Sequence, residues 1–216
     1  MLQYPTGIKG TWHSFFKNQN PVILELACGK GEYAVGLGRM YPQKNFIGVD
    51  VKGNRLWKGA KTALQEGLNN VAFLRTQIDK IIDYFDKDEV SEIWITFPDP
   101  QLRLSKIKKR LTHPRFLRLY QQFLEPTGSI HLKTDSPDLY CFTKKVIDLY
   151  ELNLSVDFED LYSEPNLEDE LKIKTHYEAL DIAQSKRVHY LQFKINKELP
   201  TGKDAELKEL FREESC

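Results

Sequence analysis

The stretch Pro21–Val22–Ile23–Leu24–Glu25–Leu26–Ala27–Cys28–Gly29–Lys30–Gly31 decides the fold class of this sequence. Its first six residues form a short, mostly apolar run, as a buried parallel strand requires, and the run ends in a glycine-containing turn. A helix is predicted from about residue 32 to residue 40, where Pro42 stops it. A strand, a glycine turn and a helix in this order indicate the first unit of an α/β sheet.

The same alternation of strands and helices continues along the chain. Further strands are predicted at 46–49, 71–74, 93–97, 129–133 and 188–195, and further helices at 56–68, 78–85, 114–124 and 139–150. Right-handed crossovers between such units give a doubly wound, mostly parallel α/β sheet with helices on both faces. The last strand alternates apolar and polar residues, so we expect it to be antiparallel. One domain is expected over 1–216, with a short extension over 1–20 and a tail over 199–216 that frays or forms a short helix.

Composition narrows the class of protein. The chain has 216 residues, of which 41% are hydrophobic and 29% charged, values typical of a soluble globular protein. The first residues lack the apolar run of a signal peptide, and no stretch approaches membrane-spanning length. The three cysteines, Cys28, Cys141 and Cys216, lie far apart and fit neither a disulfide framework nor a metal site. We therefore expect a cytoplasmic protein without a bound metal.

Charge is distributed unevenly although the formal net charge is zero. Residues 101–124 contain seven Lys or Arg and no acid, and residues 151–171 contain eight acids and no Lys or Arg. Each run taken alone is most simply a solvated surface. We interpret the acidic run in that way, although a loop that shields a pocket remains open.

Polar residues gather where the predicted strands end, which is where parallel sheets bind ligands. Glycines of the turn from Glu25 to Gly31 allow a close approach to a ligand, and Asp50 can accept hydrogen bonds from both hydroxyls of a ribose. Two cofactors fit this pattern. Gly29-x-Gly31-x-x-Ala34 satisfies the dinucleotide-binding fingerprint, so a nicotinamide-dependent oxidoreductase stays open.

Two features favour S-adenosyl-L-methionine (SAM) as the cofactor. Glu25 sits at the strand end, where a carboxylate would repel a pyrophosphate but can help to bind the cationic methionine end of SAM. The fourth predicted strand ends in Phe97–Pro98–Asp99–Pro100, a turn that presents a carboxylate. Prolines on both sides of Asp99 limit its movement. Methyltransferases hold their target base at this position.

The turn and the basic run after it make the chain resemble the bacterial tRNA (guanine-N7-)-methyltransferase family. The resemblance extends from about Lys9 to Ile195. It includes the stretch from Lys9 to Pro21, the glycine turn, Asp50, the FPDP turn, His131–Leu132–Lys133–Thr134–Asp135 and Thr175–His176–Tyr177–Glu178. It implies a seven-stranded SAM methyltransferase sheet, methyl transfer from SAM to N7 of a guanine in tRNA, and the variable-loop guanosine at position 46 as the target.

The resemblance also implies roles for individual residues. Asp99 is the expected catalytic acid, which acts by positioning and electrostatics. The expected cofactor-binding residues are Glu25, Ala27, Gly29, Gly31, Asp50 and Gln77; the expected substrate-binding residues are Arg103, Asp135, Thr175, His176, Tyr177 and Glu178; and the expected tRNA phosphate contacts are Lys106, Lys108, Lys109 and Arg110. Tyr177 either stacks on the guanine or packs in the core. Trp12, Trp57 and Trp94 are interpreted as core or surface packing residues and not as stacking platforms.

Two positions depart from the family pattern. Gln77 stands where the family often has an Asp, and Gln101 with Arg103 stands where a Trp and then a Lys are usual. Gln77 can still accept a hydrogen bond from the adenine amino group, and Arg103 keeps the charge. The alternatives are a SAM methyltransferase with another acceptor and a non-catalytic tRNA-binding protein. Monomer and homodimer are both compatible with the sequence.

Overall fold

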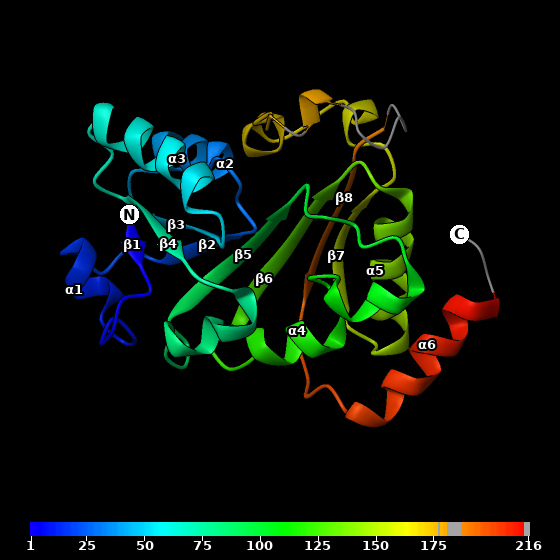
Figure 1. Cartoon of the computed structure of the whole chain (residues 1–216). Helices are drawn as coiled ribbons and strands as arrows, with labels where there is room; N and C mark the ends of the chain where they lie inside the picture. The colour runs from blue at the N-terminus through cyan, green and yellow to red at the C-terminus, as the bar shows by residue number, and fades with distance from the viewer. Residues whose placement is uncertain (177, 181–186, 214–216) are drawn as a thin grey trace.

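The centre of the computed structural model, which describes residues 1–176, 178–180 and 187–213, is an eight-stranded sheet (Figure 1). Its order is β1-β4-β3-β2-β5-β6-β8-β7. The strands are β1 (Leu2–Gln3), β2 (Val22–Leu26), β3 (Asn45–Asp50), β4 (Val71–Arg75), β5 (Val90–Thr96), β6 (Leu124–Thr134), β7 (Asn153–Phe158) and β8 (His189–Lys194). β8 runs antiparallel to its neighbours β6 and β7, and the other neighbouring pairs are parallel.

The strand order reverses between β2 and β5. From β2 the chain builds outward to β3 and β4 on one side, and then returns to add β5 and β6 on the other. The register pairs Glu25 of β2 with Gly48 of β3 and with Trp94 of β5. Because the crossovers leave in opposite directions here, the carboxyl ends of β2 and β5 bound a crevice, which is where doubly wound sheets bind ligands.

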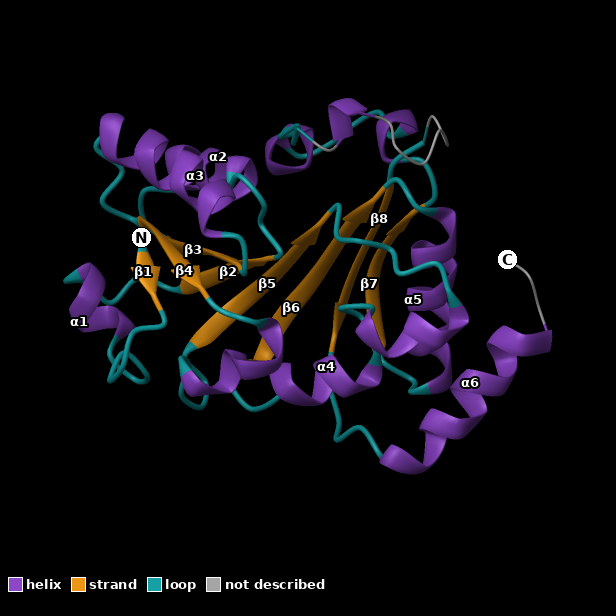
Figure 2. Cartoon of the chain, in the orientation of Figure 1, coloured by secondary structure: helices purple, strands orange, loops and turns teal. Residues whose placement is uncertain are grey.

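Helices cover both faces of the sheet (Figure 2). The α-helices are α1 (Trp12–Phe16), α2 (Glu32–Met40), α3 (Gly53–Gln65), α4 (Pro114–Tyr120), α5 (Pro137–Leu149) and α6 (Asp204–Glu213). The 3-10 helices are η1 (Ile78–Asp83), η2 (Leu104–Lys109), η3 (Leu161–Ser163), η4 (Asp169–Lys172), η5 (Glu178–Leu180) and η6 (Thr201–Lys203). Tyr33 of α2 and Leu56 of α3 are buried on one face, whereas Trp12 of α1, Phe116 of α4 and Phe142 of α5 are buried on the other.

Two caps fix where the helices beside the crevice begin. The Nδ1 atom of His113 accepts a hydrogen bond from the Arg115 N–H at 3.0 Å, and Pro114 occupies the first turn of α4, as its fixed φ favours. The Ser136 hydroxyl accepts a bond from the Leu139 N–H at 3.3 Å at the start of α5. The caps hold both helices directly after segments that carry polar residues into the crevice.

The doubly wound α/β fold expected from the sequence is confirmed, but the strand count is eight and not seven. The two strands missing from the sequence-based order are short or weakly patterned. β1 has only two residues, and β7 lies in the acidic run with mostly exposed side chains. The segment expected as a helix at 78–85 contains the 3-10 helix η1 at Ile78–Asp83. The tail forms α6, whose Asp204 accepts hydrogen bonds from Arg118 and from the Tyr150 hydroxyl.

Candidate active site

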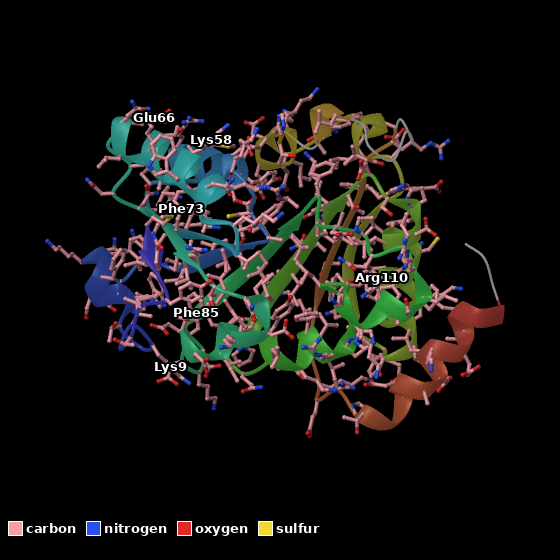
Figure 3. All side chains as sticks on the ribbon, viewed as in Figure 1. Lys9, Lys58, Glu66, Phe73, Phe85 and Arg110 are labelled. Atoms are coloured by element: carbon pink, nitrogen blue, oxygen red, sulfur yellow. The ribbon has the colours of Figure 1, made fainter. Side chains whose placement is uncertain are left out.

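In the glycine turn between β2 and α2, Ala27 lines the crevice, Gly31 lines a separate hollow at the start of α2, and Gly29 lines neither. Ala27, Gly29 and Gly31 have positive φ values of 55°, 56° and 70°. At Gly31 a side chain is also excluded by packing, since a Cβ atom there would lie 2.2 Å from Cε1 of Phe73. Phe73 belongs to β4 and lies below α2 and α3 in the view of Figure 3. The turn therefore needs glycine at Gly31 to bring the start of α2 close to the sheet.

Asp50 joins this turn to the end of β3. Its Oδ2 accepts the Gly29 N–H at 3.0 Å, and its Oδ1 accepts the Lys52 N–H at 2.8 Å. A carboxylate has about four acceptor positions, so each oxygen can take a further hydrogen bond from a ligand hydroxyl. Asp50 thus shapes the turn and also lines the crevice.

Glu25 is buried in the sheet, with only 3% of its surface exposed, and does not line the crevice. Its Oε2 accepts the Ala34 N–H at 2.8 Å, and its Oε1 accepts the Thr96 hydroxyl at 2.8 Å. Burial raises the pKa of Glu25 to about 8, although both hydrogen bonds oppose the rise. Glu25 therefore ties α2 and β5 to the end of β2 from beneath the turn.

The Phe97–Pro100 turn closes the crevice from the β5 side. Phe97 and Gln101 have φ values of 46° and 49°, which are uncommon for residues with side chains. The Phe97 N–H donates to the Lys133 carbonyl at 2.8 Å, and the Gln101 N–H donates to Asp99 Oδ1 at 3.0 Å. Strained residues of this kind persist only where their surroundings fix them. The turn presents the exposed carboxylate of Asp99 to the crevice.

The crevice has a volume of about 1120 Å³, and its wall contains five of the residues that the sequence predicts to bind cofactor or substrate or to act in catalysis. Those residues are Ala27, Asp50, Gln77, Asp99 and Asp135. They follow different strands, so only the folded sheet brings them together. Pockets for one small ligand usually measure about 300–1,000 Å³. This crevice therefore has room for a nucleoside-containing cofactor and for a second planar ligand.

The basic run after the turn contains exposed residues and residues that are buried or paired with acids. Arg103, Lys106, Lys108 and Lys109 are exposed, and Lys109 also lines the crevice. Arg110 does not join them, because it is 4% exposed and its guanidinium lies 4.7 Å from the ring centroid of Phe142 (Figure 3). Its Nε also donates to the Gln101 carbonyl at 3.4 Å. The structure therefore places Arg110 inside the protein, where it supports the turn and does not face a phosphate.

Two further arginines of the basic run are paired with acids from other elements. Arg115 forms an ion pair with Asp79 of η1 at the wall of the crevice. Arg118 forms an ion pair with Asp204 of α6. The open positive charge after the turn is accordingly concentrated at residues 103–109.

Of the expected substrate segment, the described residues Thr175, His176 and Glu178 do not line the crevice. Thr175 is buried, and its hydroxyl oxygen accepts the Glu178 N–H at 3.2 Å. Glu178 accepts hydrogen bonds from Lys133 Nζ, at 3.2 Å, and from the Tyr162 hydroxyl. His176 is exposed. The expected guanine-stacking residue, Tyr177, lies outside the described residues.

Lys133 is a structural centre to which sequence reasoning assigned no role. It is the penultimate residue of β6 and has a fully buried side chain, and its Nζ donates to the carbonyls of Leu171 and Ile173 at 2.9 Å each. Burial lowers the pKa of Lys133, and the carboxylate of Glu178 partly offsets this. The available signal was the position of this lysine in a predicted strand, directly before Thr134–Asp135 at the strand end. Through Lys133, the segment that carries Thr175 and Glu178 is fixed to the same sheet edge as Asp99.

Within the described part of the chain, no group of three or more His, Cys, Asp or Glu side chains could hold a metal ion. No described helix has both the length and the apolar character needed to cross a membrane.

Comparison with known proteins identifies the family. A family model described as "Putative methyltransferase" matches residues 19–191. The tRNA (guanine-N(7)-)-methyltransferase of Porphyromonas gingivalis is 52% identical over 188 residues, which cover 86% of this chain and 76% of that protein. The protein of the same name from Clostridioides difficile is 35% identical over 184 residues, which cover 84% of this chain and 83% of that protein.

Solved structures share the fold at low sequence identity. The 16S rRNA methyltransferase KamB has a TM-score of 0.66 at 15% identity, with 86% of this chain and 93% of that chain covered. A SAM-dependent methyltransferase from Aquifex aeolicus has a TM-score of 0.56 at 12% identity, with 87% of this chain and 94% of that chain covered. With the sequence relatives, these matches show that the chain belongs to the tRNA (guanine-N(7)-)-methyltransferase family, built on the SAM-dependent methyltransferase fold.

Proposed function

We propose that this chain transfers the methyl group of SAM to N7 of a guanine in tRNA, and that the target is the variable-loop guanosine at position 46. The observation that carries the proposal is the convergence of Asp50, Gln77, Asp99 and Asp135 on one crevice beside the exposed cations of residues 103–109. A protein that works on tRNA in this way acts in the cytoplasm. The nicotinamide alternative loses its support, because the relatives of this chain are named methyltransferases.

The residues of the crevice fit SAM. Asp50 has acceptor capacity for ribose hydroxyls beyond its two backbone bonds, and Gln77 offers both an acceptor and donors for the adenine edge. The positive φ value of Ala27 turns the backbone at the wall where the methionine end would lie. SAM supplies an electrophilic methyl group on a sulfonium.

The chemistry at guanine N7 demands alignment more than proton transfer. N7 has a free lone pair, which forms the new N–C bond while the electrons of the methyl–sulfur bond stay on sulfur. No proton has to leave guanine first, and the product ring gains a positive charge. Alignment of two bound reactants contributes at most about 7–11 kcal/mol to lowering the barrier.

Asp99 and Asp135 supply the negative charge that this reaction needs. A carboxylate can accept the guanine N1–H and exocyclic N–H groups, which orients the base. It also stabilises the positive charge that develops on the ring. The Gln101 N–H holds one oxygen of Asp99, so the carboxylate is fixed before the substrate binds. Asp99 thus acts as a positioning and electrostatic group.

Methyl transfer from labelled SAM to tRNA that lacks 7-methylguanosine, followed by nucleoside analysis, tests the proposal. Labelled 7-methylguanosine is the expected product. Asp99→Ala should reduce kcat/KM at least about 100-fold, as loss of a single preorganised electrostatic contact does, and leave the Kd for SAM within about twofold. Asp148→Asn, on the exposed side of α5, is the matched control and should have wild-type kinetics. Label on another nucleoside would contradict the substrate assignment, and an Asp99→Ala variant with full activity would contradict the site.

A further inference from the structure

The outer face of α3 combines an exposed indole with cations. The sequence from Val51 to Gln65 contains Lys52, Arg55, Lys58 and Lys61 and no acid. The indole of Trp57 is 55% exposed, whereas the other two tryptophans, Trp12 and Trp94, are 0% and 2% exposed. Trp57 is therefore a surface residue and not a core residue. We define the α3 surface by Lys52, Trp57, Lys58, Lys61 and Arg75.

A second hollow lies beside this indole. It has a volume of about 600 Å³, and its wall consists of Met1, Gln3, Val51, Lys52, Gly53, Asn54, Trp57 and Arg75. No carboxylate belongs to this wall. Met1, Val51 and Trp57 contribute apolar surface to the wall, and Lys52 and Arg75 contribute positive charge. Apolar surface next to cations matches a nucleobase joined to a phosphate.

The cations of the α3 surface keep their charge available. Within the part of the chain that the structure describes, Lys52, Lys58 and Lys61 form no ion pair with a carboxylate. Lys61 Nζ lies 5.1 Å from the ring centroid of Trp57. The Arg75 guanidinium donates to the Gln3 side chain and to the Val51 carbonyl, which are both neutral. A phosphate next to a base stacked on Trp57 would therefore meet a cation.

The α3 surface is continuous with the candidate active site. Val51 and Lys52 line both the second hollow and the crevice that holds Asp50 and Asp99. α3 begins at this shared wall and runs away from it (Figure 1). Figure 3 shows Lys58 among the helices at the upper left, well away from Arg110. The crevice is thus flanked by cations on two sides: α3 on one and residues 103–109 on the other.

We propose that the α3 surface is a second tRNA-binding site, at which an unpaired base stacks on Trp57 and flanking phosphates contact Lys58 and Lys61. The inference rests on the proposed function, because the occupant is the tRNA whose guanine enters the crevice. Base stacking on an aromatic side chain tolerates any base. Phosphate contacts fix register without reading sequence. The surface therefore contributes affinity and orientation, while base choice stays with the crevice.

Intrinsic fluorescence tests the stacking directly, because Trp57 is the exposed tryptophan among the three of the chain. Titration of the unaltered protein with tRNA should quench its emission. Trp57→Phe should keep most of the affinity for tRNA and lose most of the quenching. Trp57→Ala should weaken tRNA binding about tenfold and leave the Kd for SAM unchanged. An unquenched emission at saturating tRNA would overturn the proposal.

Salt dependence tests the phosphate contacts. The double variant Lys58→Glu/Lys61→Glu should reduce the slope of log K for tRNA against log salt by about two, one for each lost contact. Lys208→Glu, on α6 at the other end of the molecule (Figure 1), is the matched control and should keep the wild-type slope. An unchanged slope in the double variant, or a change of its oligomeric state with tRNA binding intact, would overturn the proposal. Failure of the unaltered protein to bind tRNA would instead overturn the proposed function and this site with it.

Discussion

Replacing Glu25 with Gln should remove a pH dependence of folding stability that extends from about pH 4.5 to about pH 8. Glu25 is buried, and its pKa rises from an ordinary value of 4.5 to about 8. A raised carboxyl pKa means that the folded state binds more protons than the unfolded state between these values. The stabilisation is therefore complete below about pH 4.5 and is lost as the pH rises towards 8.

The size of this effect follows from the two pKa values. One pKa unit corresponds to about 1.36 kcal/mol, so the unaltered protein should lose roughly 1.5–2 kcal/mol between pH 6.5 and pH 8 from this group. Burial lowers the pKa of His113 and of His131 to about 4. These histidines produce the opposite slope, but only below about pH 6.5. The interval from pH 6.5 to pH 8 consequently separates Glu25 from them.

Urea unfolding at several pH values, without cofactor, measures the effect. Gln can accept the Ala34 N–H with its oxygen and donate its amide to the Thr96 hydroxyl, so Glu25→Gln should fold and its free energy of unfolding should vary less with pH. Glu206→Gln, on the exposed side of α6, is the control and should follow the unaltered protein. Parallel pH profiles for the unaltered protein and Glu25→Gln would refute the reasoning.

Two further predictions concern packing at the same sheet edge. Gly31→Ala should destabilise the fold by about 2–4 kcal/mol in urea unfolding, because it adds the strain of a positive φ to a collision with Phe73. The control is Gly67→Ala, which has a positive φ but no atom within 4 Å of the added Cβ, and it should destabilise the fold by only about 1–2 kcal/mol. Equal losses of stability in the two variants would contradict the packing argument. Lys133→Met should lower kcat/KM for tRNA about 10- to 100-fold with SAM binding retained, since it removes the charge-assisted bonds that hold Glu178. Steady-state kinetics would check the second prediction, and wild-type kinetics would count against it.

The part of the crevice to which we propose that SAM binds could be predicted from sequence, because its determinants are local. Positive φ at Gly29 and Gly31 is a property of single residues, and Asp50 follows directly from the end of a strand. Parallel strands bring such ends to one edge whatever the details of packing. For the same reason Asp99 and Asp135 were placed at the crevice without knowledge of any contact. A side chain inside the strand is different, and Glu25 proved to be covered by the turn that it supports.

The substrate side depends on contacts between distant residues, which a single sequence does not reveal. Glu178 meets Lys133 across 45 positions, and Arg118 meets Asp204 across 86. Arg110 follows two exposed lysines but turns inward, because the 3-10 helix η2 ends at Lys109 and the chain then changes direction. The sequence does not predict β7, because its side chains are mostly exposed. Its position in the sheet depends on backbone pairing with β8.

The formal net charge of zero does not predict how strongly this protein binds RNA, because many of its carboxylates form ion pairs whereas the cations beside the crevice face solvent. Several carboxylates of the acidic run are neutralised by cations from other elements. The pairs are Asp157 with Lys144, Glu159 with Arg187, and Glu151 with Lys197 and Lys203. The cations of residues 103–109 and of the α3 surface face solvent on either side of the crevice. A polyanion therefore encounters a local excess of positive charge, so binding of tRNA should depend steeply on salt even for a chain with no net charge.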